Sequence, residues 1–255
     1  MAVSLSDLVD ATSSELRLGE IPDYPPAQNG LQLGNRSGEV SRIAVAVDAC
    51  LPVVKAAAEQ GADLLIVHHG MFWSGVQPIV GGYYEKLKLA MDAGLAIYSA
   101  HIPLDVHPTL GNNAQLVKAL GLGAAAKPFF DWKGIKLGLR ADVSLDRETL
   151  RENVLEATGG ASAHLCPGGP ETTQSIGVIT GGAGGEIFAL AQTGIDTFIT
   201  GEGPHWSYTA AEELGINLIY GGHYATETFG VKALASWLSD RFGLPWEFID
   251  HPTGL

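Results

Sequence analysis

IAVAVDACLPVVKAAAEQGADLLIVHHG, residues 43–70, decides the fold class of this chain. It begins with an apolar run that ends in Asp48, and it closes with a second apolar run that leads into His68 and His69. Between the two runs, apolar residues recur at helical spacing up to Gly61, a residue type that commonly follows the end of a helix. A strand, a helix and a second strand in this order predict an α/β fold with a mostly parallel sheet covered on both faces.

The second half of the chain repeats this pattern. The spacing of 18 residues between Ile43 and Gly61 returns between Ile176 and Gly194. In the same register, Asp63 aligns with Asp196, and residues 68–69 align with residues 201–202. Further along the chain, residues 98–101 match residues 220–223. Any two βαβ units resemble one another, but the matched landmarks favour an internal duplication. We therefore expect two similar halves, residues 1–125 and residues 126–255.

The remaining elements follow from the same periodicities. We expect strands at residues 95–98, 136–140 and 196–199, and helices at residues 84–93, 146–158, 187–192 and from about residue 226 to residue 242. Residues 121–134 are rich in Gly and Ala, a composition typical of a linker between the halves.

The composition limits the classes of partner. Hydrophobic residues make up 46% of the 255 residues and charged residues 17%, as in a soluble protein with a substantial core. The net charge is −13 and the 15 lysines and arginines form no basic stripe, so we expect neither nucleic acid nor a membrane surface as a partner. Cys50 and Cys166 are too few for a disulfide framework or a thiolate zinc site. The start has no secretory pattern, and no apolar run approaches the ~18 residues of a membrane span, so we expect a cytoplasmic protein.

Metal-binding side chains follow three of the expected strands. One strand leads into His68 and His69, a second into His101 and Asp105, and a third into His223 and Glu227. Because ligands of open α/β sheets collect at the carboxyl ends of the strands, we expect these groups to meet. Imidazole and carboxylate suit zinc, iron or manganese. The sequence therefore predicts a metal centre.

Two cations are the favoured arrangement. Neighbouring residues on a strand point in opposite directions, so His68 and His69 serve one ion only if the chain turns at Gly70, and otherwise serve two. A carboxylate can bridge two cations, which makes Asp105 and Glu227 the expected bridges. Two cations about 3.5–4 Å apart would hold a water and lower its pKa. Glu227 is also expected in the first turn of its helix, where the helix dipole favours an ionised carboxylate.

Each signal has a simpler interpretation. His223 and Glu227 could form a helix cap, and His101 and Asp105 could share a hydrogen bond within a loop. The run of glycines at residues 181–185 fits no phosphate-binding motif and favours a tight turn. The chain has no Gly-x-Ser-x-Gly motif, which excludes a serine hydrolase of that type.

These motifs resemble those of the NIF-three-like family (Ngg-one-interacting-factor-three-like proteins), whose members are often named GTP cyclohydrolase type 2 homologues. The resemblance covers nearly the whole chain. The segments that carry it are NGLQLG at residues 29–34, HH at 68–69, residues 101–105 with GNN at 111–113, TGE at 200–202 and GHYATE at 222–227. Gly70 stands where many relatives have Pro, and Trp206 follows His205 where a second His is common; both departures leave the five ligands intact.

The resemblance implies a dinuclear metal centre whose ligands are His68, His69, Asp105, His223 and Glu227. It also implies a duplicated three-layer α/β/α fold and a ring-shaped homo-hexamer built as a trimer of dimers. Zinc or iron is the usual metal of the family. Only about forty residues separate Gly121 from Glu171, so the third domain that larger members insert has no room here.

The leading hypothesis is a metal-dependent hydrolase, similar to a type 2 GTP cyclohydrolase, that acts on a small nucleotide-like or phosphate-bearing substrate. His101 or His205 would donate a proton or orient a ligand, and Glu202 would contact the substrate or transfer a proton. The rival hypothesis, from another class, is a non-catalytic hexamer that binds or buffers metal ions or regulates other proteins.

Overall fold

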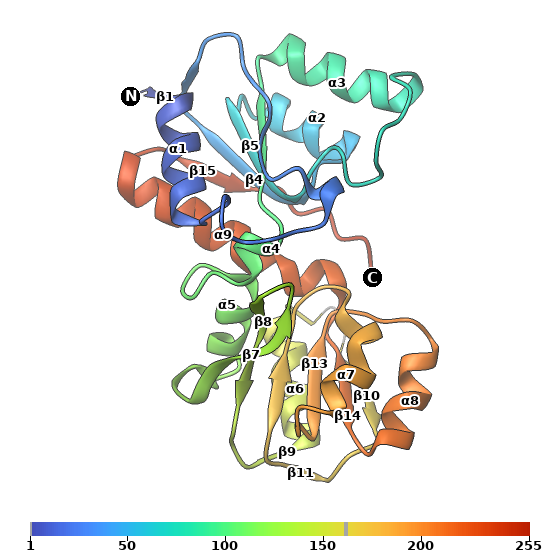
Figure 1. The fold of residues 1–255 in the computed structure, drawn as a ribbon. Coiled ribbons are helices and arrows are strands. Elements are labelled where there is room, and N and C mark those ends of the chain that lie inside the picture. Colours follow the sequence, from blue (N-terminus) through green and yellow to red (C-terminus); the bar gives the residue numbers. More distant parts are fainter. Residues whose placement is uncertain (1, 161–162) are drawn as a thin grey trace. The chain divides into compact units, whose positions relative to one another are not determined.

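The computed structural model describes residues 2–160 and 163–255, which form two compact units (Figure 1). Unit 1 comprises Met1–Leu104 and Gly230–His251, and unit 2 comprises Asp105–Phe229 and Pro252–Leu255. The two units are defined by contacts between residues, whereas the two predicted halves are defined by the sequence repeat. The predicted division of the chain at residue 125 therefore stays a prediction. None of the helices in the described part of the chain combines the length and hydropathy that a membrane span requires.

Unit 1 is built around a five-stranded sheet in the order β15-β4-β5-β6-β2. Its parallel strands are β15 (Trp246–Phe248), β4 (Ile43–Asp48), β5 (Leu64–His69) and β6 (Ala96–Ser99), and β2 (Gly30–Leu33) is antiparallel to β6. The short strands β1 (Val3–Ser4) and β3 (Glu39–Val40) pair separately. The apolar runs of the sequence are thus the buried centre of a sheet, as expected.

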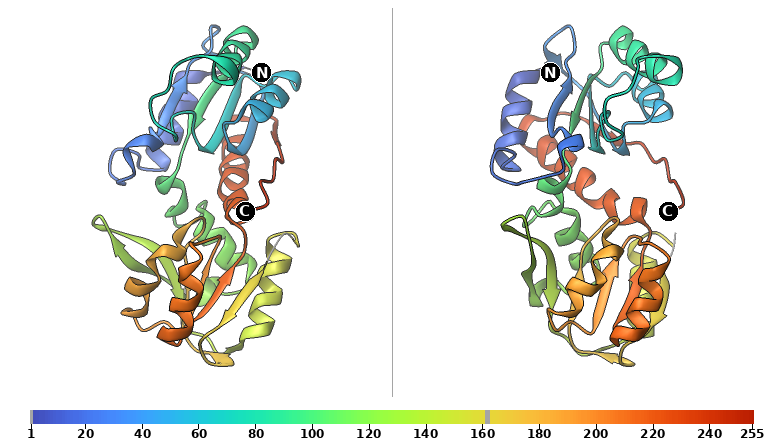
Figure 2. Two further views of the ribbon diagram at one scale, coloured as in Figure 1. Left: turned by 90° about the vertical axis from the view of Figure 1, so that its right-hand side faces the viewer. Right: turned by 45° about the vertical axis from the view of Figure 1, so that its right-hand side comes forward.

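Helices cover both faces of this sheet (Figure 2). On one face lie α2 (Leu51–Glu59) and α3 (Gly81–Ala93), and on the other lie α1 (Leu5–Glu15) and the unit 1 part of α9 (His223–Phe242). One core cluster contains Val53, Val54 and Ala57 of α2 with Ala44, Ala46, Leu65, Val67 and Ile97 of the strands. Toward the α1 face, the Tyr98 hydroxyl bonds Ser13 at 3.0 Å. Alternate strand residues therefore pack against opposite helix layers.

Unit 2 has a six-stranded mixed sheet in the order β10-β14-β13-β12-β8-β7. The central strands β12 (Ile176–Val178), β13 (Thr197–Thr200) and β14 (Asn217–Tyr220) are parallel, and β10 (His164–Pro167), β8 (Ile135–Ala141) and β7 (Ala126–Trp132) are antiparallel to their neighbours. A small ladder joins β9 (Leu145–Asp146) to β11 (Thr172–Thr173). The predicted fold class, α/β with mixed and partly parallel sheets, is confirmed.

The segment expected to be a linker, residues 121–134, belongs to unit 2. It contains a 3-10 turn, η2 (Gly123–Ala125), and β7, which forms a hairpin with β8. The prediction was wrong because Gly and Ala are concentrated at residues 121–126, whereas β7 contains Phe129, Phe130 and Trp132, residue types that favour a strand, and pairs with β8. The half-exposed strand expected after it is confirmed as β8.

Helices also cover both faces of the unit 2 sheet (Figure 2). One face carries α5 (Asn112–Ala119) and α6 (Arg147–Ala157), and the other carries α7 (Ile187–Ala191) and α8 (Trp206–Leu214). A core cluster joins Leu116, Val117, Leu150 and Val154 of the first pair to Ile176, Val178, Ile199 and Ile219 of the sheet. The short helix α4 (Ile102–Asp105) and the 3-10 turns η1 (Pro25–Ala27) and η3 (Ala183–Glu186) occupy connections.

Two aspartates occupy the same structural position in the two units. The Oδ2 atom of Asp63 accepts bonds from the backbone N–H groups of the two residues before β4, at 2.7 and 3.2 Å. The Oδ2 atom of Asp196 accepts bonds from the two residues before β12, also at 2.7 and 3.2 Å. Asp63 thereby links the start of β5 to the residues that precede β4, and Asp196 links the start of β13 to the residues that precede β12. This shared arrangement supports the predicted duplication.

Replacing Asp63 by Ala should lower the free energy of unfolding by about 1 kcal/mol, because two backbone N–H groups lose a charged acceptor. Urea denaturation measures this as a lower midpoint. Asp92→Ala on the exposed surface of α3 is the control and should shift the midpoint much less. An unchanged midpoint for Asp63→Ala would mean that water replaces the carboxylate without loss.

Candidate metal centre

Unit 1 gathers three imidazoles at the carboxyl ends of neighbouring strands. His68 and His69 are the last residues of β5, and His101 lies two residues after β6. Each ring offers one nitrogen atom, and these three atoms lie within 4.8 Å of one another. The rings of His68 and His69 approach to 4.8 Å between centroids, so the chain brings the adjacent pair together rather than apart. His101, expected as a proton donor, lies among the metal-binding candidates.

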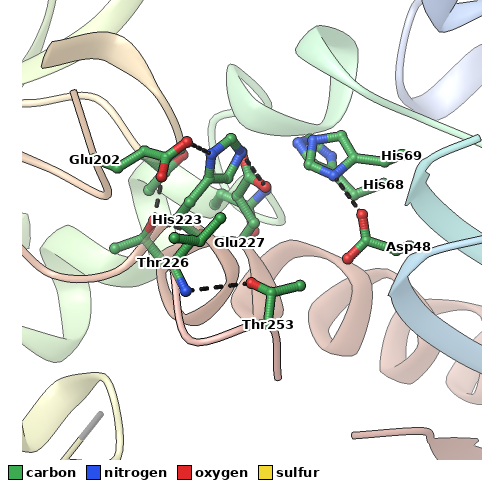
Figure 3. Close-up of polar contacts among 12 residues, drawn as sticks. Asp48, His68, His69, Glu202, His223, Thr226, Glu227 and Thr253 are labelled. Carbon is green, nitrogen blue, oxygen red and sulfur yellow. Dashed lines mark hydrogen bonds and ion pairs between the residues drawn. The ribbon is translucent and has the colours of Figure 1, made fainter. Parts of the chain in front are cut away.

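Each imidazole of this cluster is held through its Nδ1 atom. His68 is fully buried and its Nδ1 lies 2.9 Å from the carbonyl oxygen of Ala100. The Nδ1 of His69 lies 2.9 Å from Asp48 Oδ1 (Figure 3), and the Nδ1 of His101 lies 2.8 Å from Asp23 Oδ1. An N–H at Nδ1 that donates to oxygen leaves the lone pair on Nε2, which is the form of imidazole that binds a metal.

Among the residues that hold the three imidazoles, Asp23 takes part in the largest network of hydrogen bonds. Its Oδ2 accepts the backbone N–H of Ile102 at 2.9 Å and the side-chain amide of Asn29 at 2.7 Å. Asn29 Oδ1 in turn accepts the backbone N–H of His101 at 2.8 Å. Burial of Asp23 opposes its charge, but the bonds from His101 and Asn29 outweigh burial and lower the pKa of the carboxyl. The NGLQLG motif therefore acts by fixing the loop that carries His101.

Gly70 allows a close approach at the end of β5. A Cβ at this position would lie 2.2 Å from Gln32 Nε2, so the Gln32 side chain takes its present place beside the backbone because residue 70 is Gly. Gln32 Oε1 accepts the backbone N–H of Met71 at 2.7 Å, and Nε2 donates to the carbonyl of Ala27 at 3.1 Å. The Gln32 amide thus joins the loop after the histidine pair to the segment before β2.

Unit 2 gathers Asp105, His223 and Glu227. His223 Nε2 lies 3.1 Å from Glu227 Oε2, and His223 Nδ1 lies 2.9 Å from Glu202 Oε1 (Figure 3). A carboxylate oxygen of Asp105 lies within 4.8 Å of one of Glu227. Glu227 and Asp105 are 3% and 7% exposed, so two acids are buried side by side. Burying paired carboxylates is unfavourable unless a cation or a proton compensates them.

Polar side chains of unit 2 orient Asp105. Its Oδ1 accepts the side-chain amide of Asn112 at 2.8 Å and the hydroxyl of Thr180 at 3.3 Å. Asn113 accepts the backbone N–H of Thr180 at 2.9 Å. The GNN motif at residues 111–113 therefore fixes this carboxylate and the turn that follows β12.

The charge on His223 depends on its acidic neighbours. Burial disfavours the imidazolium, but hydrogen bonds and charge from Glu227 and Glu202 outweigh burial and raise the pKa of His223 to about 9. A cation that binds at Nε2 has to displace the proton that the two acids stabilise. Glu202, expected to contact a substrate, is bonded to a candidate ligand.

The helix that carries Glu227 begins earlier than expected. α9 starts at His223 rather than near residue 226, so His223 and Glu227 lie one turn apart on the same helix face. The expectation that Glu227 lies in the first turn was wrong, and so was the helix-cap interpretation. His and Tyr are weak signals of a helix start, and no Ser, Thr, Asp or Asn marks the boundary in sequence.

The glycine run at residues 181–185 forms the expected tight turn, but this turn packs against the site. Gly181 has a φ of +71°, and its carbonyl accepts the backbone N–H of Gly201 at 2.8 Å and of Glu202 at 3.0 Å. A Cβ at Gly181 would lie 2.1 Å from Glu227 Oε1 and 3.4 Å from His223 Nε2. Sequence reasoning missed this role, although the glycine run itself marked an unusual backbone.

The structure does not bring every candidate together. His205 is exposed at the start of α8, where it lines a separate pocket with His164, Pro204 and Tyr208. The supports Asp23, Asp48 and Gln32 were also missed in sequence. The NGLQLG segment was visible as a motif, but nothing local showed which loop it would contact.

The donor sets fit divalent cations. Four imidazoles have Nδ1 directed at an oxygen atom, which is the common arrangement of metal-binding histidines. Buried carboxylates accompany them in unit 2, and nitrogen with carboxylate oxygen suits zinc, iron or manganese. The described residues therefore contain His, Asp and Glu clusters that can bind metal ions.

Comparison with known proteins identifies the family of the chain. Residues 4–253 match the family described as Duf34/NIF3 (NGG1p interacting factor 3). The chain belongs to this family. A protein of Deinococcus radiodurans named GTP cyclohydrolase 1 type 2 homolog is 42% identical, over 99% of this chain and 95% of that relative. A protein of the same name from Halobacterium salinarum is 37% identical, over 99% of this chain and 100% of that relative.

Solved structures of related proteins have the same fold. The crystal structure of a protein from Thermus thermophilus superposes with a TM-score of 0.88 at 37% identity, over 99% of this chain and 100% of that one. The resemblance read from the GHYATE and HH segments is thus confirmed at the level of family and fold.

Gly181→Ala should weaken metal binding by about 10–100-fold, because the new methyl group displaces the Glu227 carboxylate. Metal titration of the purified variant followed by elemental analysis measures this loss. Gly215→Ala is a matched control, since Gly215 has a φ of +70° and open space around its Cβ position.

Both variants carry the same backbone strain, of about 1–2 kcal/mol, so both should lose similar stability. Only Gly181→Ala should lose metal. Equal metal affinity in the two variants would contradict the assigned contact with Glu227.

Proposed function

We propose that this chain is a metal-dependent hydrolase that uses two divalent cations held by His68, His69, Asp105, His223 and Glu227. The observation that carries the proposal is the uniform orientation of the imidazoles: each directs Nδ1 at an oxygen atom, which leaves Nε2 for a cation. The name of the relatives, GTP cyclohydrolase 1 type 2 homolog, supports a small nucleotide-like or phosphate-bearing substrate.

The proposal requires ligands from both units to share one centre. The chain passes between the units at Leu104–Asp105 and again at Phe229–Gly230. Asp105 directly follows the first passage, His101 precedes it by three residues, and Glu227 precedes the second passage by two. Since a residue spans at most ~3.3–3.6 Å, each of these three groups lies within a short reach of a passage of the chain between the units.

The protein groups divide into ligands and supports. The carboxylates of Asp105 and Glu227 and the three imidazoles of His68, His69 and His223 would hold the two cations. Two bound cations would supply a water nucleophile at neutral pH and a Lewis acid. Asp48 and Asp23 hold their imidazoles in the ligating tautomer, and Glu202 does the same for His223.

His101 has two proposed roles that fit its place beside His68 and His69. It either donates a proton to the leaving group or adds a further ligand. His205 and Glu202 remain proposed proton-transfer or substrate groups of the same reaction.

The proposal includes zinc or iron as the metal, with manganese as an alternative, a cytoplasmic location and a homo-hexamer assembled as a trimer of dimers. Light scattering of the purified protein tests the hexamer, for which we expect six times the mass of the 26.8 kDa chain. A monomeric mass at micromolar concentration would contradict it.

Glu227→Gln should remove at least one of two ions per chain and abolish turnover, because the amide cannot bridge two cations with charged oxygens. Elemental analysis measures the ions. Turnover is measured on protein loaded with zinc, iron or manganese and supplied with GTP, other nucleotides, phosphodiesters and cyclic amides. Glu213→Gln on the exposed surface of α8 is the control and should match the wild-type protein.

The outcomes separate the two classes of function. Two ions with turnover of any of these substrates supports the hydrolase. Two ions without turnover under any metal would reject the hydrolase and favour the non-catalytic metal-binding protein. Wild-type protein that takes up no ion would reject both.

A further inference from the structure

Two large aromatic side chains lie exposed beside the histidine cluster of unit 1. Tyr24 is 45% exposed and Trp73 is 40% exposed. The Trp73 ring lies 4.5 Å from His101 and 5.3 Å from His69 between centroids, and Tyr24 lies 6.3 Å from His101. Such rings offer a large apolar surface that gains free energy when another ring covers it.

The two aromatic rings are arranged as a pair. They meet edge to face, with centroids 6.4 Å apart and an interplanar angle of 90°. This T-shaped contact is a favoured aromatic geometry and it fixes both rings. Each ring therefore keeps exposed surface of defined orientation within reach of the candidate ligands.

The segments that carry the pair also enclose a cleft. Pro25, Pro26 and Gln28 line it on the Tyr24 side, and Phe72, Gly75 and Val76 line it on the Trp73 side. Its volume of about 390 Å³ lies in the range of small-molecule sites. The lining is mainly apolar, which suits a flat ring better than a charged group.

We propose that Tyr24 and Trp73 bind a planar nitrogen heterocycle of nucleobase size, by stacking, next to the metal centre. The inference deepens the proposed function and rests on it for the position of the reacting group. Every nucleobase offers a π face to an aromatic side chain, and its ring nitrogen and carbonyl oxygen atoms are donors that a cation accepts. Stacking and coordination would together orient the ring.

The charge around the cluster favours recognition of the ring over recognition of a phosphate. Asp48 and Asp23 lie directly behind the imidazoles of His69 and His101, and the chain carries a net charge of −13. Such a field repels an anion in the absence of a bound cation. Without a bound cation, a nucleoside should therefore bind nearly as well as its nucleotide.

Calorimetric titration with guanosine, GMP and ribose 5-phosphate tests the proposal, on protein with and without added zinc. On protein without zinc, guanosine and GMP should bind with similar affinity, and ribose 5-phosphate should bind at least tenfold more weakly. Trp73→Leu should weaken guanosine binding about tenfold, whereas Trp73→Phe should stay within about threefold of wild type.

Trp206→Leu is the matched control. Trp206 is 46% exposed and stacks on Phe188 at 5.8 Å in unit 2, so its loss removes a comparable aromatic surface from the other unit. Guanosine binding by this variant should equal that of wild type. Light scattering of the Trp73 variants checks the assembly state, since a changed mass with unchanged guanosine affinity would assign Trp73 to a subunit contact and overturn the proposal.

The remaining outcomes separate this inference from the metal centre. Equal guanosine affinity of Trp73→Leu and wild type would overturn it, and so would tight binding of ribose 5-phosphate without guanosine. Protein that holds two ions yet binds no heterocycle would overturn the inference and leave the metal centre standing. Trp73-dependent binding by protein that takes up no ion would support the ring site and reject the metal-dependent hydrolase.

Discussion

An imidazole can offer Nε2 to a cation only when its proton sits on Nδ1, and the site chemistry of this protein depends on that constraint. His68 meets it with a backbone carbonyl, and His69, His101 and His223 meet it with the carboxylates of Asp48, Asp23 and Glu202. Removing any acceptor would free the ring to rotate or to change tautomer. The loops around the strands are organised by these bonds as much as by packing.

The duplicated βαβ units supply the rigid frame from which those bonds are made. In each unit an aspartate at the start of the second parallel strand, Asp63 or Asp196, holds the chain that enters the first. Helices bury both faces of the sheets, so the strand ends are the places where polar side chains can gather without disturbing the core. Gly70 and Gly181 then allow Gln32 and Glu227 to approach the backbone more closely than any other residue would permit.

The acidic surroundings set the charge of the candidate site while no cation is bound. Glu202 and Glu227 raise the pKa of His223 to about 9, and buried Asp105 lies near Glu227. Without a cation, the cluster of His223 and its acidic neighbours therefore retains protons. A cation that binds there displaces them. An excess of negative charge attracts divalent ions and, in their absence, repels anions, which makes the proposed stacking on Trp73 and Tyr24 suited to selecting an uncharged ring.

The sequence by itself determined the α/β class, the repeat and the residues at the strand ends, because periodicity and strand termini are local properties of residues 43–70 and their counterparts. It also identified the family through short motifs. Only the tertiary structure decided that Asp23 supports His101 from 78 positions away, that Gly181 contacts Glu227, and that α9 begins at His223. It also showed that the segment expected to be a linker contains the strand β7. The physical reason is that hydrogen-bond partners and close approaches between loops depend on how the chain returns on itself, which no local pattern of side chains encodes.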